Sequence, residues 1–320
     1  MQLRNKRVKS IVGISIGLAL ICHILYTLLL NPSFTNHSFI QFFNEAQNLL
    51  LILVLLLLLS SGIEIVKWKL LLSSQQEVSW KQASSSVLIG QAASFVTPNR
   101  IGDYPARILS LNNKLTYGTI TLSILSASAQ TLAILIVSEI AFLTLINYLR
   151  TPLFTLLFEI NSIIIIGMLF FYFKIEALSV VFSKLKMIKK IKKYILVVQV
   201  IPKKLYITAF ILSVIKFTIY SFQLYLLLQL SNQELSPYIL FMLSIIYFWG
   251  LTIIPSIAFA ELGIRNKWGL FLFSLLAIQN WKITIIITSL WLINIVFPAL
   301  IGVLIWFYKQ SKNKWYASIG

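Results

Sequence analysis

The sequence predicts an all-α polytopic membrane protein that forms a single integral membrane domain over residues 1–320. Hydrophobic residues make up 58% of the chain and charged residues only 11%, whereas a soluble domain carries about 25% charged residues. Several apolar stretches reach about 18 to 25 residues, which is the length that a helix needs to cross roughly 30 Å of hydrocarbon. These stretches are continuous rather than alternating, so they indicate helices and not the strands of a barrel.

Basic residues between the apolar stretches predict the topology. Six segments are long enough to cross as full spans, namely 11–30, 46–66, 117–138, 153–173, 205–229 and 283–307. A basic segment, 1–10, precedes the first span, whereas the 31–45 loop contains no lysine or arginine. Because positive charge accumulates in cytoplasmic loops, we expect a multi-pass protein of the cytoplasmic (inner or plasma) membrane with both termini in the cytoplasm.

Two apolar segments, 84–111 and 238–279, do not fit as simple spans and predict re-entrant hairpins. Each contains a proline, an acid, a neighbouring glycine and an arginine four residues after the acid. These residues are Pro98, Gly102, Asp103 and Arg107 in the first segment, and Pro255, Glu261, Gly263 and Arg265 in the second. Proline stops a helix and glycine permits a sharp turn, while an acid and an arginine at this spacing share a helical face. In an alternative interpretation, 238–254 and 267–279 cross as full or distorted spans.

The order of these elements suggests an inverted-topology repeat. The first half, 11–173, has its hairpin entering from the cytoplasm, and the second half, 205–307, has its hairpin entering from outside. Such repeats place broken helices around a polar site near the membrane midplane. The link between the halves, 174–204, holds nine lysines and one acid. This link is predicted to be cytoplasmic, either as an interfacial amphipathic helix attracted to anionic lipids or as an ordinary basic loop.

The two hairpin motifs resemble those of the lysylphosphatidylglycerol synthase transmembrane-domain family, a flippase-like membrane domain. The matching residues are Pro98, Arg100, Gly102, Asp103 and Arg107 early in the chain, and Pro255, Leu262, Gly263 and Arg265 late in it. The resemblance extends over about 11–307. Asn99 stands where many relatives have glycine, and Asn266 stands where they place an acid. The chain ends soon after the last span, so the resemblance implies a stand-alone membrane domain that translocates a lipid or lipid-linked molecule, without lysyl transfer.

Ionisable residues inside a membrane are costly, so each requires a reason. Arginine holds phosphates and carboxylates through two parallel hydrogen bonds. The candidates for binding an anionic headgroup are Arg100, Asp103, Arg107, Lys216, Glu261 and Arg265. Alternatively, the acid–arginine pairs only fix the hairpin tips. Lys216 is expected either to pair with Glu139 or Glu159 or to line the same cavity. The aromatic residues Tyr104, Tyr220 and Trp249 are expected to pack in the bundle.

The sequence favours a flippase or transporter of an anionic lipid or lipid-linked molecule, with membrane lipids as its partners. One alternative is a membrane enzyme that acts on a lipid phosphate through Asp103 and Glu261, and another is a scaffold that transports nothing. The chain has one aspartate, Asp103, and its one cysteine and two histidines lie outside the hairpin motifs. We therefore expect no catalytic residues, no cofactor and no metal ion. Since the net charge of +18 is concentrated between spans, we expect no nucleic-acid partner.

Overall fold

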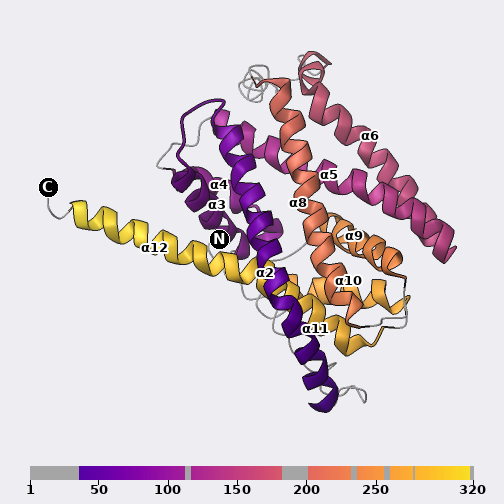
Figure 1. The fold of residues 1–320 in the computed structure, drawn as a ribbon. Coiled ribbons are helices and arrows are strands. Elements are labelled where there is room, and N and C mark those ends of the chain that lie inside the picture. Colours follow the sequence, from indigo (N-terminus) through magenta and orange to yellow (C-terminus); the bar gives the residue numbers. More distant parts are fainter. Residues whose placement is uncertain are drawn as a thin grey trace, which may run out of the picture.

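The computed structural model describes residues 36–111, 117–181, 201–231, 236–255, 260–276 and 278–317, and every regular element in these segments is helical. The longest are α2 (Asn36–Leu72), α5 (Tyr117–Leu149), α6 (Pro152–Val181) and α8 (Lys203–Gln229). A fifth long rod consists of α11 (Asn280–Trp291), a π-helical turn η3 (Leu292–Val296) and α12 (Phe297–Ala317) (Figure 1).

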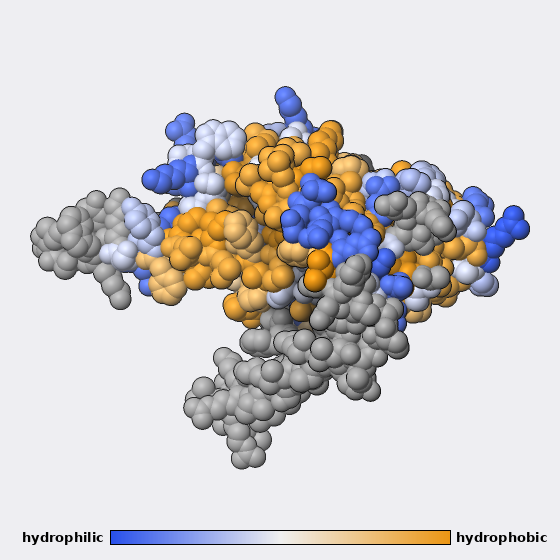
Figure 2. All heavy atoms as spheres, turned by 60° about the horizontal axis from the view of Figure 1, so that its bottom comes forward, coloured by the Kyte–Doolittle hydropathy of each residue, from blue (hydrophilic) through white to orange (hydrophobic). Residues whose placement is uncertain are grey.

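Five of the predicted spans coincide with these long elements, which are the five helices of the described residues that are long and apolar enough to cross a membrane. Large apolar side chains lie on their exposed faces, for example Leu58 on α2, Ile163 on α6 and Leu304 on α12. Figure 2 shows that apolar residues cover much of one face, while polar residues gather in patches. Such extensive apolar exposure is unusual in a soluble monomer, so these faces suit contact with lipid and the protein is a multi-pass membrane protein.

Two parts of the topology map lie outside the described residues. They are the first predicted span, 11–30, and residues 182–200, which make up most of the basic link. The total number of spans and the form of the basic link therefore stay predictions.

Both segments predicted to be hairpins are helical hairpins. Hairpin 1 consists of α3 (Trp80–Phe95), the short turn η1 (Pro98–Arg100) and α4 (Asp103–Leu109), and hairpin 2 consists of α9 (Pro237–Ile253) and α10 (Glu261–Ser274). The first arm of hairpin 1 starts at a capping box, in which Ser79 and Gln82 bond to each other's backbone amides. The arms have 7 to 17 residues, fewer than the roughly 20 of a full span. Their re-entrance into a membrane stays a prediction.

The two hairpins extend from opposite ends of an antiparallel helix pair. α2 and α8 run in opposite directions (Figure 1), and Gln223 on α8 donates a hydrogen bond of 3.0 Å to the backbone oxygen of Leu53 on α2. Hairpin 1 follows the C-terminal end of α2, and hairpin 2 follows the C-terminal end of α8. This arrangement is the one that an inverted-topology repeat requires.

Each hairpin is packed against a different neighbour. Gly302 of α12 lies so close to α3 that a Cβ atom there would overlap the backbone oxygen of Leu88. Nearby, Lys309 Nζ donates to Ser85 Oγ at 2.8 Å and to the backbone oxygen of Ser110 at 3.2 Å. α12 is therefore fixed to both arms of hairpin 1.

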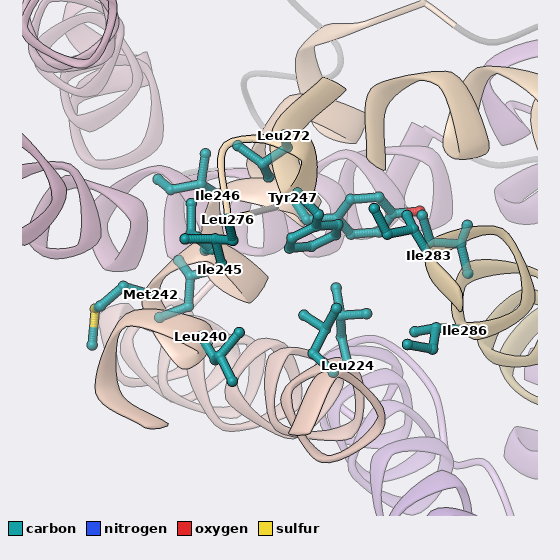
Figure 3. Close-up of a cluster of buried hydrophobic side chains, with 14 of the residues drawn as sticks. Leu224, Leu240, Met242, Ile245, Ile246, Tyr247, Leu272, Leu276, Ile283 and Ile286 are labelled. Atoms are coloured by element: carbon teal, nitrogen blue, oxygen red, sulfur yellow. The ribbon is translucent and has the colours of Figure 1, made fainter. Parts of the chain in front are cut away.

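Hairpin 2 instead belongs to a large apolar core with α5, α8 and α11. In Figure 3, Ile246 of α9 lies near Leu272 of α10, and Tyr247 of α9 lies near Ile283 of α11. Leu224 of α8 belongs to the same core. Gly250 of α9 admits the ring of Trp268 from α10, whose Nε1 donates to the backbone oxygen of Tyr247 at 2.9 Å. The second hairpin is therefore held within the bundle by apolar packing.

Candidate functional site

The turn of hairpin 1 is made by two residues in the left-handed region of backbone conformation. Asn99 has a φ of 48° and Arg100 a φ of 58°, and asparagine tolerates this region better than most residues. Gly102, which we expected to make the turn, has an ordinary φ of −64°. It is required instead for close packing, because a Cβ atom there would lie 2.8 Å from the Ala93 oxygen and the Thr97 side chain.

Each hairpin places its acid and its arginine in the same way. Asp103 is the first residue of α4 and Glu261 is the first residue of α10, where the helix dipole favours negative charge. Arg107 donates to both oxygens of Asp103 at 2.6 and 2.7 Å. Arg265 donates to Glu261 Oε1 from Nε at 3.0 Å and from Nη2 at 2.7 Å. The predicted pairing of acid and arginine one helical turn apart is therefore present in both hairpins.

The prolines and glycines of the two motifs lie at different positions relative to the helices of their hairpins. Pro98 opens η1, and Pro255 directly follows the end of α9. Gly263 does not precede its helix as Gly102 does, because α10 already begins at Glu261 and the glycine is buried in its first turn. The two motifs are thus similar in their ion pairs but not in their glycines.

Arg107 also belongs to a buried charge cluster that the sequence analysis did not predict. Its Nη1 lies 2.7 Å from Glu64 Oε1 on α2. The other oxygen of Glu64 lies 2.7 Å from Lys216 on α8 and 3.1 Å from Lys67, which also donates to Ser213 Oγ at 3.3 Å. Lys216 therefore pairs with Glu64, and the expected pairing with Glu139 or Glu159 is wrong. Glu139 is bonded to Asn161 of α6, and Glu159 lies on α6 near the α5–α6 turn.

The cluster carries more positive than negative charge. Its cations are Arg107, Lys67 and Lys216, and its carboxylates are Glu64 and Asp103. The rings of Trp68 and Tyr104 lie 5.6 and 5.5 Å from the guanidinium carbon of Arg107 and contribute attraction of the cation–π kind. One positive charge is left unbalanced if all five groups are ionised, and Lys216 is the cation of the cluster that reaches a cavity.

That cavity, which we call the cationic cavity, has a volume of about 260 Å³. Arg100 of hairpin 1, Arg265 of hairpin 2 and Lys216 of α8 all line it. A second hollow of about 370 Å³, which we call the tip hollow, lies between Arg100 and the break of hairpin 2, and Glu261 and Pro255 also line it. Arg100 and Arg265 line both spaces. The tips of the two hairpins therefore meet around one polar region.

Further polar groups line the cationic cavity without a partner in the described structure. Gln130 Oε1, Trp291 Nε1 and Asn294 Oδ1 are buried and have no hydrogen bond there. Asn294 lies in the π-helical turn η3, and such turns occur frequently at functional sites. Because a buried polar group without a partner is costly, these atoms suit a bound polar ligand. The indole N–H of Trp291 in particular is a donor for an anion.

The structure thus brings four of the six candidates, Arg100, Lys216, Glu261 and Arg265, to the cavity region. Asp103 and Arg107 line neither space. Arg107 is nevertheless linked to the cavity, because it and Lys216 form ion pairs with the same carboxylate, that of Glu64. Sequence reasoning overlooked Glu64, although its spacing of three residues from Lys67 at the end of a predicted span indicated a pair on one helical face. Within the described part of the chain, no three His, Cys, Asp or Glu side chains gather as metal ligands would.

Comparison with known proteins identifies the family. No match to this chain was found among curated proteins or among solved structures. The family model described as Lysylphosphatidylglycerol synthase TM region matches residues 11–302. These residues include both hairpins, Glu64 and the three cations of the cationic cavity. Since the match covers nearly the whole chain, the protein belongs to the lysylphosphatidylglycerol synthase TM region family, whose name relates this membrane domain to lipid handling.

Proposed function

We propose that this protein binds an anionic lipid or lipid-linked molecule by its headgroup and moves that headgroup across the cytoplasmic membrane. The observation that carries the proposal is the placement of Arg100, Lys216 and Arg265 around one cavity between the hairpin tips. Lys216 and Arg265 have Glu64 and Glu261 as partners, whereas Arg100 brings a further positive charge to the cavity, which an anion would offset.

The hydrogen bonds of these cations support an anionic ligand. Arg100 Nη2 donates to Ser94 Oγ at 3.2 Å, and no carboxylate of the described residues lies within ion-pair distance of Arg100. Lys216 shares its carboxylate partner with two other cations. An anion in the cavity would therefore meet positive charge that the protein balances only in part.

The arrangement of the hairpins supports movement rather than binding alone. The cavity is lined by both halves of the chain, and the hairpins that meet there come from opposite ends of the α2–α8 pair. In transporters with inverted repeats, rocking of one half against the other opens such a site alternately to each side. The apolar outer faces of the long helices leave room for acyl chains to remain in the lipid while the headgroup moves.

The enzyme alternative has weaker support from the same geometry. Asp103 and Glu261, its candidate acids, are each held by an arginine through two hydrogen bonds. A general acid or base needs a carboxyl group within reach of the reacting atoms, whereas both of these carboxylates are occupied by their arginine partners.

The proposal is tested by the double substitution Arg100→Gln, Arg265→Gln. The purified protein is analysed by native mass spectrometry for retained lipid, and liposomes containing it are assayed for translocation of labelled phospholipids with anionic headgroups. Since hydrogen bonds to charged groups contribute about 1.5–3 kcal/mol, we expect retention and rate to fall by roughly tenfold or more. Arg150→Gln is the matched control, because Arg150 lines a separate hollow at the α5–α6 turn.

The outcomes separate the alternatives. Retention and translocation at wild-type levels in the folded double variant would refute the proposal. Arginine-dependent lipid binding without any movement would refute transport while leaving a binding site. If the wild-type protein retains no lipid and moves none, the scaffold interpretation is favoured.

A further inference from the structure

Glu139 lies on α5, within the candidate membrane span Tyr117–Leu149, and no cation of the described residues is paired with it. It accepts hydrogen bonds from Asn161 Nδ2 and Ser162 Oγ of α6. Ten residues separate it from Leu149, where α5 ends, which corresponds to about 15 Å along a helix. No Lys, Arg or His in the described structure lies within ion-pair distance of Glu139.

The charged and titratable groups on the helices packed around α5 have other locations or partners. Glu159 of α6 lines the hollow at the α5–α6 turn together with Arg150. Glu64 of α2 and Lys216 of α8 pair with each other, and Tyr247 of α9 lines the cationic cavity. Tyr238 of α9 shares a hydrogen bond of 3.1 Å with Thr144, more than one turn along α5 from Glu139.

The hydrogen-bond partners of Glu139 suit both of its protonation states. A hydroxyl group can donate or accept, whereas an amide nitrogen only donates. When Glu139 is ionised, Ser162 donates to Oε1 and Asn161 donates to Oε2. When a proton from the aqueous phase is bound at Oε1, the carboxyl O–H donates to Ser162 Oγ. Asn161 still donates to Oε2, but this bond is weaker because its acceptor is no longer charged. The site therefore exchanges one proton without losing a hydrogen bond.

An isolated carboxylate in hydrocarbon is costly, and uncompensated intramembrane acids characterise proton pathways. We propose that Glu139 is a proton-binding site whose occupancy is transmitted through Asn161 to Trp249 of hairpin 2. Trp249 Nε1 donates to Asn161 Oδ1 at 2.8 Å, so one amide contacts both the acid and the hairpin. Leu251 and Thr252, which follow closely on α9, line the cationic cavity. The proposal does not depend on the proposed anion transport, since it requires no bound lipid.

The test uses dicyclohexylcarbodiimide, an apolar reagent that modifies protonated carboxyl groups in membranes. The full-length protein in liposomes is labelled over a range of about pH 5 to 9, and the adducts are located by mass spectrometry of peptides. We expect an adduct on Glu139 that decreases as the pH rises. Glu139→Gln should remove it and keep the helical circular dichroism spectrum. Glu64, surrounded by three cations, is the internal control and should not react.

Two variants test the hydrogen-bond chain. Ser162→Ala removes a donor to the ionised acid, and we expect the labelling midpoint to move to higher pH by about one unit or more. Trp249→Phe releases the Asn161 amide and should move the midpoint in the same direction by a smaller amount. An unlabelled Glu139 in the folded protein, or labelling that is the same at every pH, would overturn the proton site. An unchanged midpoint in Trp249→Phe would overturn the transmission to hairpin 2.

Discussion

Glu64 on α2 lies 2.7 Å from Lys216 on α8, and this ion pair joins the first helix of each half of the described structure. Through its other oxygen, Glu64 also holds Arg107 of hairpin 1 at 2.7 Å. One buried carboxylate therefore connects two long helices, a hairpin and the wall of the cationic cavity.

Glu64→Gln should destabilise the protein strongly. The change leaves Lys67, Arg107 and Lys216 close together with Asp103 as the remaining acid of the cluster, and removing one partner of a buried ion pair costs about 3–5 kcal/mol. Denaturant titration in detergent, followed by helical circular dichroism, measures the free energy of unfolding. Glu159→Gln, at an exposed position of α6, should change it by less than about 0.5 kcal/mol. Equal effects of the two substitutions would contradict the cluster's role.

The backbone at Asn99 predicts a difference between two substitutions. At a φ of 48°, valine pays a steric cost of roughly 1–2 kcal/mol that glycine avoids. Asn99→Gly should therefore be more stable than Asn99→Val by about that amount, as measured by the free energy of unfolding. If valine were tolerated as well as glycine, the turn would not require the left-handed conformation.

Gly90→Ala should separate the two arms of hairpin 1. The added Cβ atom would lie 2.5 Å from Arg107 Cγ and 2.9 Å from the backbone oxygen of Asp103, and overpacking of this kind costs about 1–3 kcal/mol. Gly62→Ala is the matched control, because no atom beyond its chain neighbours and its own helical backbone lies within 4 Å of its Cβ position. There alanine should stabilise α2 by about 0.5–1 kcal/mol. Opposite signs of the two changes in unfolding free energy are expected, and a loss in both would count against the packing described.

Lys309→Met should loosen hairpin 1 locally. The change removes the hydrogen bonds from Lys309 to Ser85 and Ser110, and charged hydrogen bonds contribute about 1.5–3 kcal/mol. Hydrogen exchange of backbone amides in 98–111 should accelerate by on the order of tenfold. Lys282→Met, which removes a bond to the Ser231 oxygen at the end of α8, should leave these amides unchanged. Similar exchange in both variants would indicate that Lys309 does not fix the hairpin.

Much of the fold follows from local properties of the sequence. Long apolar runs predict the five described spans, and the pairing of Asp103 with Arg107 follows from helical spacing alone. The contact between Glu64 and Lys216 joins residues 152 positions apart, so periodicity could not predict it. The turn was predicted at Gly102 because glycine permits unusual dihedral angles, whereas Asn99 and Arg100 adopt them. A cavity depends on how separate helices pack, which no single segment determines.

The close contact at Gly302 and the hydrogen bonds of Lys309 couple the C-terminal helix to hairpin 1. Because α12 is fastened to both arms of hairpin 1, any displacement of that hairpin carries the C-terminal helix with it. Hairpin 2 is enclosed by α5, α8 and α11, and α11 continues through η3 into α12. The last helical rod therefore contacts both hairpins, so that a displacement of one hairpin is transmitted along the rod to the surroundings of the other.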